Sequence, residues 1–319
     1  MLTSQIAAIL NSAERRSRNT GSATNASGVR KNSDIPQSVF RYTTKKRAPS
    51  GGPIATMIWI IQTFSACEML TPGFGPRDHV RITEADGTPR KKPDGSPEIR
   101  TILFPLSSAT LYDVWDVIGL RGTGTDSYSV DNLFIPEKFA ALRDEPSALR
   151  EKGPLYKIPT NAIYSMGFAA TSLGVARAQF DAAIDLSRKK TPQGLSAMKE
   201  NSAVQGLIGL TEAKLRRARA YLFATAAEVW DDLVRGPFTE AHRVALRLAA
   251  TSTIHQSTEI VDVAYHMAGA TAVFRANGFE RRLRDMHAIN QQLQARDSHY
   301  EEMGKAILSG NLVGPPAAR

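Results

Sequence analysis

The sequence predicts an α+β chain in which a small antiparallel β-domain is followed by a C-terminal four-helix bundle. Residues 77 to about 145 show alternating polar and apolar residues separated by turn signals. Residues 160 to 310 show apolar residues at helical spacing, and short Gly- and Pro-rich breaks divide them into four segments, as in an antiparallel bundle. We therefore expect three regions, which are residues 1–76, a β-domain over 77–150 and the bundle over 151–319.

The N-terminal region is basic and has no regular pattern. Residues 1–50 contain nine Lys and Arg against two acidic residues, a surplus of 7 out of the net charge of +9. A basic segment that is rich in Ser, Asn and Thr and poor in aromatic residues is typical of a disordered tail. We favour a tail over nucleic-acid binding because no base-reading motif accompanies the charge. A transit peptide, which this start resembles in composition alone, is a weaker alternative.

Neither a membrane span nor a metal site is expected. The apolar run Ile54–Ile61 is well short of the roughly 20 residues of a spanning helix, and a buried strand or irregular segment is the better interpretation. The single cysteine, Cys67, excludes an intramolecular disulfide and a Cys-cluster metal site. It also fits a reducing compartment, so we predict a cytoplasmic location.

The β-region begins with a predicted hairpin. Residues 79–83 and 98–105 both alternate, and the polar connection between them contains two Asp-Gly steps, which favour tight turns. The stretch from Trp115 to Glu137, WDVIGLRGTGTDSYSVDNLFIPE, then predicts a strand, a Gly-rich turn and a second strand that ends at Pro136. Glycines at this spacing allow a tight turn or a close approach to a ligand.

Four long helices are expected in the C-terminal region. Their predicted ranges are 161–190, 196–234, 239–268 and 280–308. Small residues in the first helix would allow another helix to pack closely against it. Thr239 is a predicted N-cap of the third helix, and Gly269 is its predicted C-terminal stop.

Two motifs together resemble the acyl-CoA dehydrogenase superfamily. The first is the tryptophan followed by GLRGTGT and a strand ending in FIPE. The second lies between Ala264 and Gly310, where Ala268-Gly269-Ala270 precedes Arg281, Arg284, Asp285 and His287 in the family pattern R-x-x-R-D. The resemblance covers roughly residues 77–310 and is nearest to the branch of two-component flavin-dependent monooxygenases.

The resemblance implies a flavin, FAD or FMN, bound by a homotetramer that assembles through the helical bundle. A flavin phosphate needs guanidinium donors, and its adenine end needs a close backbone approach. The implied cofactor-binding residues are Gly122, Thr123, Gly124, Thr125, Arg188, Gln205, Gly269 and Arg284. Structural alternatives stay open for three of them. Arg188 can simply oppose a helix dipole, Arg284 can pair with Glu280 or Asp285, and Gly269 is a helix stop in any case.

The sequence departs from the family at the catalytic positions. Dehydrogenases of the family use a glutamate as base, and its two alternative positions are held here by Leu293 and Tyr164. The monooxygenase branch uses a histidine where this chain has Gln292. His287 is the nearest titratable substitute, and we expect it to anchor its helix rather than abstract a proton. The catalytic residues are therefore unknown, with His287 and Gln292 as weak candidates.

The chain is interpreted as a flavin-dependent oxidoreductase, either a dehydrogenase or a monooxygenase. Expected partners are a small-molecule or acyl-CoA substrate and a flavin reductase, with no nucleic acid and no membrane. The family's separate N-terminal helical domain has no counterpart in the pattern of residues 1–76, for which a truncated, mis-started or shifted reading frame is one explanation. The alternative function is that of a non-catalytic, oligomeric remnant of the fold. The residues do not choose between FAD and FMN.

Overall fold

The computed structural model describes residues 77–84, 86–93, 95–130, 133–142 and 144–310. The predictions for residues 1–76, including the disordered tail and the apolar segment, lie outside these ranges. The chain forms two compact units. Of the described residues, 118–120 and 151–310 belong to a helical unit, and 77–117 and 121–150 belong to a smaller β-unit.

The β-unit contains two small antiparallel sheets. The first has the order β1-β2-β5, and the second pairs β3 with β4. The predicted hairpin is confirmed, because β1 pairs with β2 from Arg77 opposite Leu103 to Arg81 opposite Ile99. The strands are β1 (Arg77–Arg81), β2 (Ile99–Leu103), β3 (Thr110–Tyr112), β4 (Ser127–Ser129) and β5 (Ala140–Leu142).

Alternation places the core of the β-unit on one face of the hairpin. Val80, Ile82, Ile102 and Phe104 are each at most 2% exposed and form one cluster. Tyr128 packs on this cluster, with its ring centroid 5.8 Å from that of Phe104. The buried residues of each arm of the hairpin are two positions apart, as expected for side chains on one face of a sheet.

The predicted strand–turn–strand over residues 115–137 is wrong in its first half. Residues 113–120 form no strand, and a short 3₁₀ helix, η4 (Arg121–Thr123), follows them. Of the second predicted strand, β4 forms, and residues 133–136 on the far side of the gap at 131–132 are not in a strand. Residues 118–120 instead belong to the helical unit.

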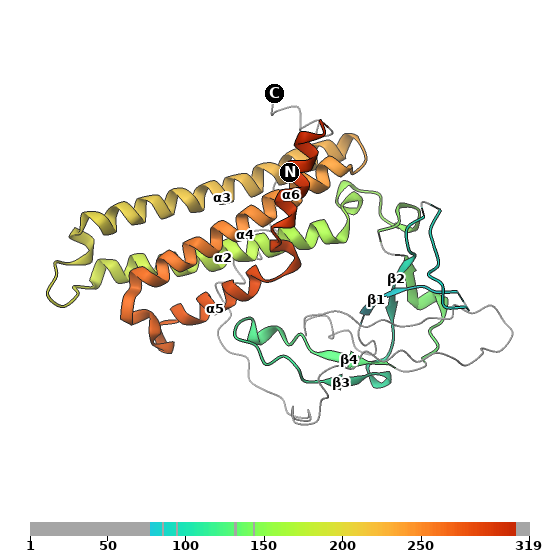
Figure 1. Ribbon diagram of the computed structural model, residues 1–319, viewed down its shortest axis with the longest axis horizontal. Helices are drawn as coiled ribbons and strands as arrows, with labels where there is room; N and C mark the ends of the chain where they lie inside the picture. The colour runs from blue at the N-terminus through green and yellow to red at the C-terminus, as the bar shows by residue number, and fades with distance from the viewer. Residues whose placement is uncertain (1–76, 85, 94, 131–132, 143, 311–319) are drawn as a thin grey trace. The chain divides into compact units, whose positions relative to one another are not determined.

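The helical unit contains three long helices that lie side by side (Figure 1) and two shorter ones. Their bounds are α2 (Thr160–Lys189), α3 (Ser202–Arg235), α4 (Glu240–Ala268), α5 (Phe279–Asn290) and α6 (Ser298–Leu308). The three long helices agree with the predicted segments, but the fourth predicted helix is two helices separated by the 3₁₀ turn η11 (Leu293–Ala295). Side chains of α4 explain this break. Thr251 Oγ1 donates to Gln294 O and the His255 ring lies 2.8 Å from Ala295 O, so these carbonyls bond to α4 instead of continuing a helix.

The closest packing in the helical unit is between α2 and α4. Small residues line both helices at this contact, and Ala169, Ala176, Ala249 and Ala250 are fully buried there. Small side chains let two helix backbones approach closely, which agrees with the sequence prediction for the first helix. Larger side chains such as Phe180, Leu222 and Ile254 complete the core.

The helix ends follow ordinary capping chemistry. Asn201 caps α3 by accepting from the amides of Ala203 and Val204. Thr239 caps α4 as predicted, because its hydroxyl accepts from the amide of His242 while the His242 ring accepts from the Thr239 amide. Gly269 ends α4 with a φ of 58°, a conformation that glycine adopts most easily.

None of the helices in the described part of the chain combines the length and the apolar character needed to cross a lipid bilayer.

The capping box at Thr239 provides a test of the α4 assignment. Thr239→Ala removes the acceptor for the His242 amide and should lower the free energy of unfolding by about 1 kcal/mol. Thr239→Ser keeps a hydroxyl at the same place and is the matched control. Urea denaturation of the three proteins measures the difference. Equal stabilities of Thr239→Ala and wild type would contradict the cap.

Candidate functional site

Residues from the two motifs that resemble the family, 165 and 166 positions apart in sequence, contact each other at α5. The Leu120 amide donates to Asp285 Oδ1 at 2.7 Å, and Arg284 Nη1 donates to Ile118 O at 3.0 Å. The remaining donors of Arg284 face Glu280 on the same helix, with Nε 2.7 Å from Oε2. Asp285 and Arg284 therefore hold residues 118–120, which come immediately before the Gly-rich loop. The pairing of Arg284 with Glu280, one of the structural alternatives left open from the sequence, is therefore present.

Gly119 permits this attachment because the backbones touch there. A Cβ atom added to Gly119 would lie 2.1 Å from the carbonyl oxygen of Arg284 and 2.8 Å from the amide nitrogen of Asp285. No side chain fits at such distances. Leu120 has a φ of 55°, in the left-handed region that costs a non-glycine residue about 1–2 kcal/mol. Its side chain packs against the core of the helical unit, which helps to offset that cost.

The Gly-rich loop belongs to the β-unit and is organised by its own contacts. Asp126 Oδ1 accepts from the amides of Val114 and Trp115, each at 3.2 Å, and so ties the two ends of the loop together. Gly124 has a φ of 57°, and a Cβ at Gly122 would have no neighbour within 4 Å. The hydroxyls of Thr123 and Thr125 lie 3.3 Å apart. The loop thus presents open backbone and two hydroxyls, which are suitable groups for binding a polar ligand.

A second group of predicted residues lies where α2 and α4 end. Lys190 Nζ donates to Ala268 O at 2.9 Å and to Thr271 Oγ1 at 3.0 Å, and it is the nearest atom, at 3.8 Å, to a Cβ built on Gly269. Gln205 Nε2 donates to Lys199 O in the turn that follows α2. Arg188, whose side chain is 69% exposed, pairs with Asp185 at 2.8 Å. This end of the helical unit is therefore cationic, and the Arg188 guanidinium is accessible to solvent.

His287 faces a carboxylate on the neighbouring helix. Its Nε2 lies 2.8 Å from Asp262 Oδ1 on α4, and both side chains are partly exposed. An ionised carboxylate only accepts, so Nε2 carries the hydrogen and Nδ1 of the neutral ring is the free base. The contact joins α5 to α4, which fits the anchoring role expected for His287. Gln292 begins the turn η11, which places it beyond the end of α5.

The predicted site residues fall into three separate groups. Arg188, Gln205 and Gly269 share one end of the helical unit, Arg284 and His287 lie along α5, and Gly122 to Thr125 form the loop of the β-unit. Sequence reasoning missed Lys190 and Asp262. Each is a common polar residue in a helical pattern, and only the tertiary structure gives it a partner. In the described part of the chain, no group of three or more His, Cys, Asp or Glu side chains could hold a metal ion.

The Gly119 contact yields a direct test. Gly119→Ala places a methyl group against the Arg284 carbonyl and should destabilise the helical unit by about 1–3 kcal/mol or more, as overpacking does. Gly122→Ala, three residues away, meets open space and is the matched control. Thermal unfolding should show a melting temperature lowered by several degrees for Gly119→Ala alone. Equal melting temperatures for the two variants would refute the close approach.

The helical unit matches a known family. Residues 166–296 match the family described as acyl-CoA dehydrogenase, C-terminal domain. Among curated proteins, the chain is 25% identical over 207 residues to an indole-3-acetate monooxygenase of Acinetobacter baumannii, covering 64% of this chain and 53% of that protein. It is 27% identical to the oxygenase subunit HsaA, a flavin-dependent monooxygenase of Rhodococcus jostii, covering 61% and 54%. A putative acyl-CoA dehydrogenase of Bacillus subtilis, YdbM, is 30% identical, with 56% and 44% covered.

Solved structures with the same fold include a 3-HSA hydroxylase from Rhodococcus sp. RHA1. It superposes with a TM-score of 0.62 at 22% identity and covers 73% of this chain and 64% of that one. XiaF from Streptomyces sp., solved with FADH2 and glycerol, superposes with a TM-score of 0.62 at 17% identity and covers 77% and 66%.

The chain spans about half the length of the curated relatives it matches. Within that span, its sequence and fold resemble the acyl-CoA dehydrogenase superfamily and, inside it, the flavin-dependent monooxygenases.

Proposed function

We propose that this chain is a flavin-dependent oxidoreductase that acts as a monooxygenase. The observation that carries the proposal is the sequence similarity of the chain to flavin-dependent monooxygenases, together with the match of residues 166–296 to the acyl-CoA dehydrogenase C-terminal domain. Monooxygenation is favoured over dehydrogenation because the indole-3-acetate monooxygenase and the oxygenase subunit HsaA are among the proteins whose sequences match this chain.

The residues present fit a flavin in their chemistry. A flavin phosphate is an anion, and Arg188 offers an exposed guanidinium that pairs with Asp185 on the same helix. Gly269 and Gly122 leave room for a close backbone approach. Thr123 and Thr125 offer hydroxyls, and Gln205 offers an amide. We propose Arg188, Gln205 and Gly269 in the helical unit and Gly122–Thr125 in the β-unit as flavin contacts, with Arg284 supporting the loop.

The protein's own groups would orient substrate and manage protons. A bound reduced flavin would supply the electrons with which one atom of dioxygen enters the substrate and the other leaves as water. The catalytic base stays unassigned, and His287, which anchors α5 to α4, is the candidate proton acceptor because Asp262 accepts from Nε2–H and Nδ1 is then the basic nitrogen of the neutral ring. Gln292 is a proposed hydrogen-bonding group for substrate, since an amide can orient a ligand without titrating.

The proposed partners follow from this function. An oxygenase component needs a flavin reductase to supply reduced flavin, as the name of HsaA as an oxygenase subunit suggests for that protein. We propose a homotetramer that assembles through the helices and a cytoplasmic location. The proposed substrate is a small aromatic molecule, by comparison with the indole-3-acetate monooxygenase, with an acyl-CoA as the alternative. FAD and FMN are both retained as cofactors.

Flavin titration tests the cofactor proposal. If Arg188 contacts a flavin phosphate, Arg188→Ala should weaken binding by about 1.5–3 kcal/mol, as for one charge-assisted hydrogen bond. Arg216→Ala is the matched control, because Arg216 is a similarly exposed arginine, on α3, that pairs with Glu212. Fluorescence quenching of FMN and FAD by each protein measures affinity. Equal affinities in all three proteins would remove Arg188 from the site. No binding to wild type at millimolar flavin would favour the non-catalytic alternative.

The proton-acceptor role of His287 has its own test. His287→Gln keeps an N–H donor for Asp262 but removes the base at Nδ1, so it should fold normally and bind flavin normally. Substrate hydroxylation should fall by about 10²- to 10⁴-fold. The assay supplies reduced flavin and oxygen with indole-3-acetate as the first substrate, and product is measured by chromatography. Wild-type turnover in His287→Gln would exclude His287 as the base.

A further inference from the structure

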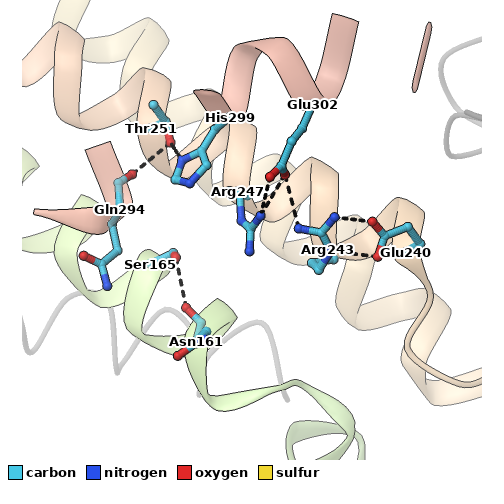
Figure 2. A network of polar contacts seen from close by, with 9 residues as sticks. All are labelled: Asn161, Ser165, Glu240, Arg243, Arg247, Thr251, Gln294, His299 and Glu302. Atoms are coloured by element: carbon cyan, nitrogen blue, oxygen red, sulfur yellow. Dashed lines mark hydrogen bonds and ion pairs between the residues drawn. The ribbon is translucent and has the colours of Figure 1, made fainter. Parts of the chain in front are cut away.

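Helix α6 is attached to the rest of the helical unit in a different way from the long helices. Of its eleven residues only His299 is buried, while Ile307 and Leu308 are 63% and 90% exposed. Apolar burial therefore stabilises its position very little. Figure 2 shows what does hold it, which is a set of polar contacts with α4.

His299 is the buried residue among these polar contacts. Its Nδ1 lies 2.7 Å from Thr251 Oγ1, and the Thr251 hydroxyl donates to Gln294 O at 2.8 Å. Because a hydroxyl has a single proton and Thr251 gives it to Gln294, the hydroxyl must accept from Nδ1–H of His299. The contact therefore fixes the tautomer of a neutral, buried imidazole that is 6% exposed.

Glu302 occupies the next turn of α6. Its carboxylate accepts from Arg247 Nη1 at 2.7 Å and from Arg243 Nη1 at 3.2 Å, and Arg243 also pairs with Glu240 (Figure 2). Burial opposes ionisation of Glu302, but hydrogen bonds from Arg247 and Arg243 outweigh it and hold its pKa below the usual value. Glu302 therefore stays ionised down to pH values below about 4.5.

The charges around His299 make its protonation unfavourable. Arg247 and Arg243 act on it from α4 and Arg296 acts on it from the link between η11 and α6, whereas the negative charge of Glu302 on α6 opposes their effect. Burial lowers the pKa of His299 first, and Arg247 lowers it further. A proton therefore binds more readily once the imidazole has left this site, so lowering the pH favours release of α6.

We propose that α6 is a pH-sensitive latch that separates from α4 when His299 becomes protonated. The hinge is Arg296–Asp297, because η11 stays attached through the bond from Thr251 to Gln294 O and the contact of His255 with Ala295 O. Opening releases Glu302 from Arg243 and Arg247 and leaves these two guanidinium groups free to meet another anion.

The sign of the pH dependence follows from the direction of the pKa shift. Because the pKa of His299 is lower in the closed state than in the open state, the closed state is most stable at pH values above the pKa of the free side chain, about 6.5. That stability is lost as the pH falls from about 6.5 toward the lower pKa of the closed state, and the opening constant rises by up to about tenfold for each pH unit. Glu302 does not titrate in this window.

Hydrogen exchange of the full chain, followed by mass spectrometry at pH 7.5 and pH 5.5, tests the latch. After correction for intrinsic exchange rates, amides of α6 should lose protection at pH 5.5 by several-fold, whereas amides of α3 should not. His299→Asn keeps an N–H donor for Thr251 but does not titrate, so it should abolish the difference between the two pH values. His266→Asn changes an exposed histidine of α4 and should leave the difference intact.

Two results would overturn the latch. One is a parallel loss of protection in α6 and α3, and the other is persistence of the pH difference in His299→Asn. If His299→Asn does not fold, Glu302→Gln is used instead. It should lower the protection of α6 at both pH values and keep the pH difference, and unchanged protection of α6 in that variant would refute the role of its ion pairs.

Discussion

Helix α5 holds residues 118–120 by two hydrogen bonds and by a backbone contact that only glycine permits. Asp285 accepts a hydrogen bond from the Leu120 amide, and Arg284 donates one to the Ile118 carbonyl. Gly119, between these two residues, lies against the Arg284 carbonyl. The three contacts depend on one another, because a side chain at Gly119 would separate the groups that form the other two. They make residues 118–120 part of the helical unit although their chain neighbours belong to the β-unit.

This attachment limits where the Gly-rich loop can begin. Leu120 is held in the left-handed region, and the chain enters η4 directly after it. Strain at a single residue of this kind persists where the surroundings stabilise it, and here the packing of the Leu120 side chain and the bond to Asp285 do so. The proposed flavin contacts at Gly122–Thr125 therefore follow a segment whose conformation is fixed by α5. A loop with a fixed start loses less conformational entropy on binding a ligand than a free one.

Sequence periodicity predicted the elements whose side chains follow one simple pattern. The hairpin of β1 and β2, the three long helices, the cap at Thr239 and the stop at Gly269 all have local causes. Periodicity gave wrong predictions where a residue far away in sequence determines the backbone conformation. The apolar residues between Val114 and Leu120 predicted a strand, but residues 118–120 are instead bound to α5 and belong to the helical unit. Likewise residues 280–308 read as one helix, but Thr251 and His255 take the carbonyls that would continue it.

Some residues of the candidate site could likewise be predicted from local sequence patterns, whereas others gain their partners only in the folded structure. Glycines and arginines at family spacing made the Gly-rich loop, Gly269 and Arg284 candidates from the sequence, and their roles at a flavin stay predictions. Asp262 and Lys190 gave no signal, because an aspartate or a lysine on a helix is usually solvated and these two gain partners only through packing. The division of the chain at residue 150 and the flavin contacts themselves stay predictions.

The central claim is that Asp285 holds residues 118–120, the segment before the Gly-rich loop, on helix α5. Amide hydrogen exchange at Leu120, measured by NMR in wild type and in Asp285→Ala, tests it most directly. We predict a strongly protected Leu120 amide in wild type and fast exchange in Asp285→Ala, with amides in the middle of α2 and α4 unchanged. Fast exchange of the Leu120 amide in wild type, or equal protection in the two proteins, would contradict the account.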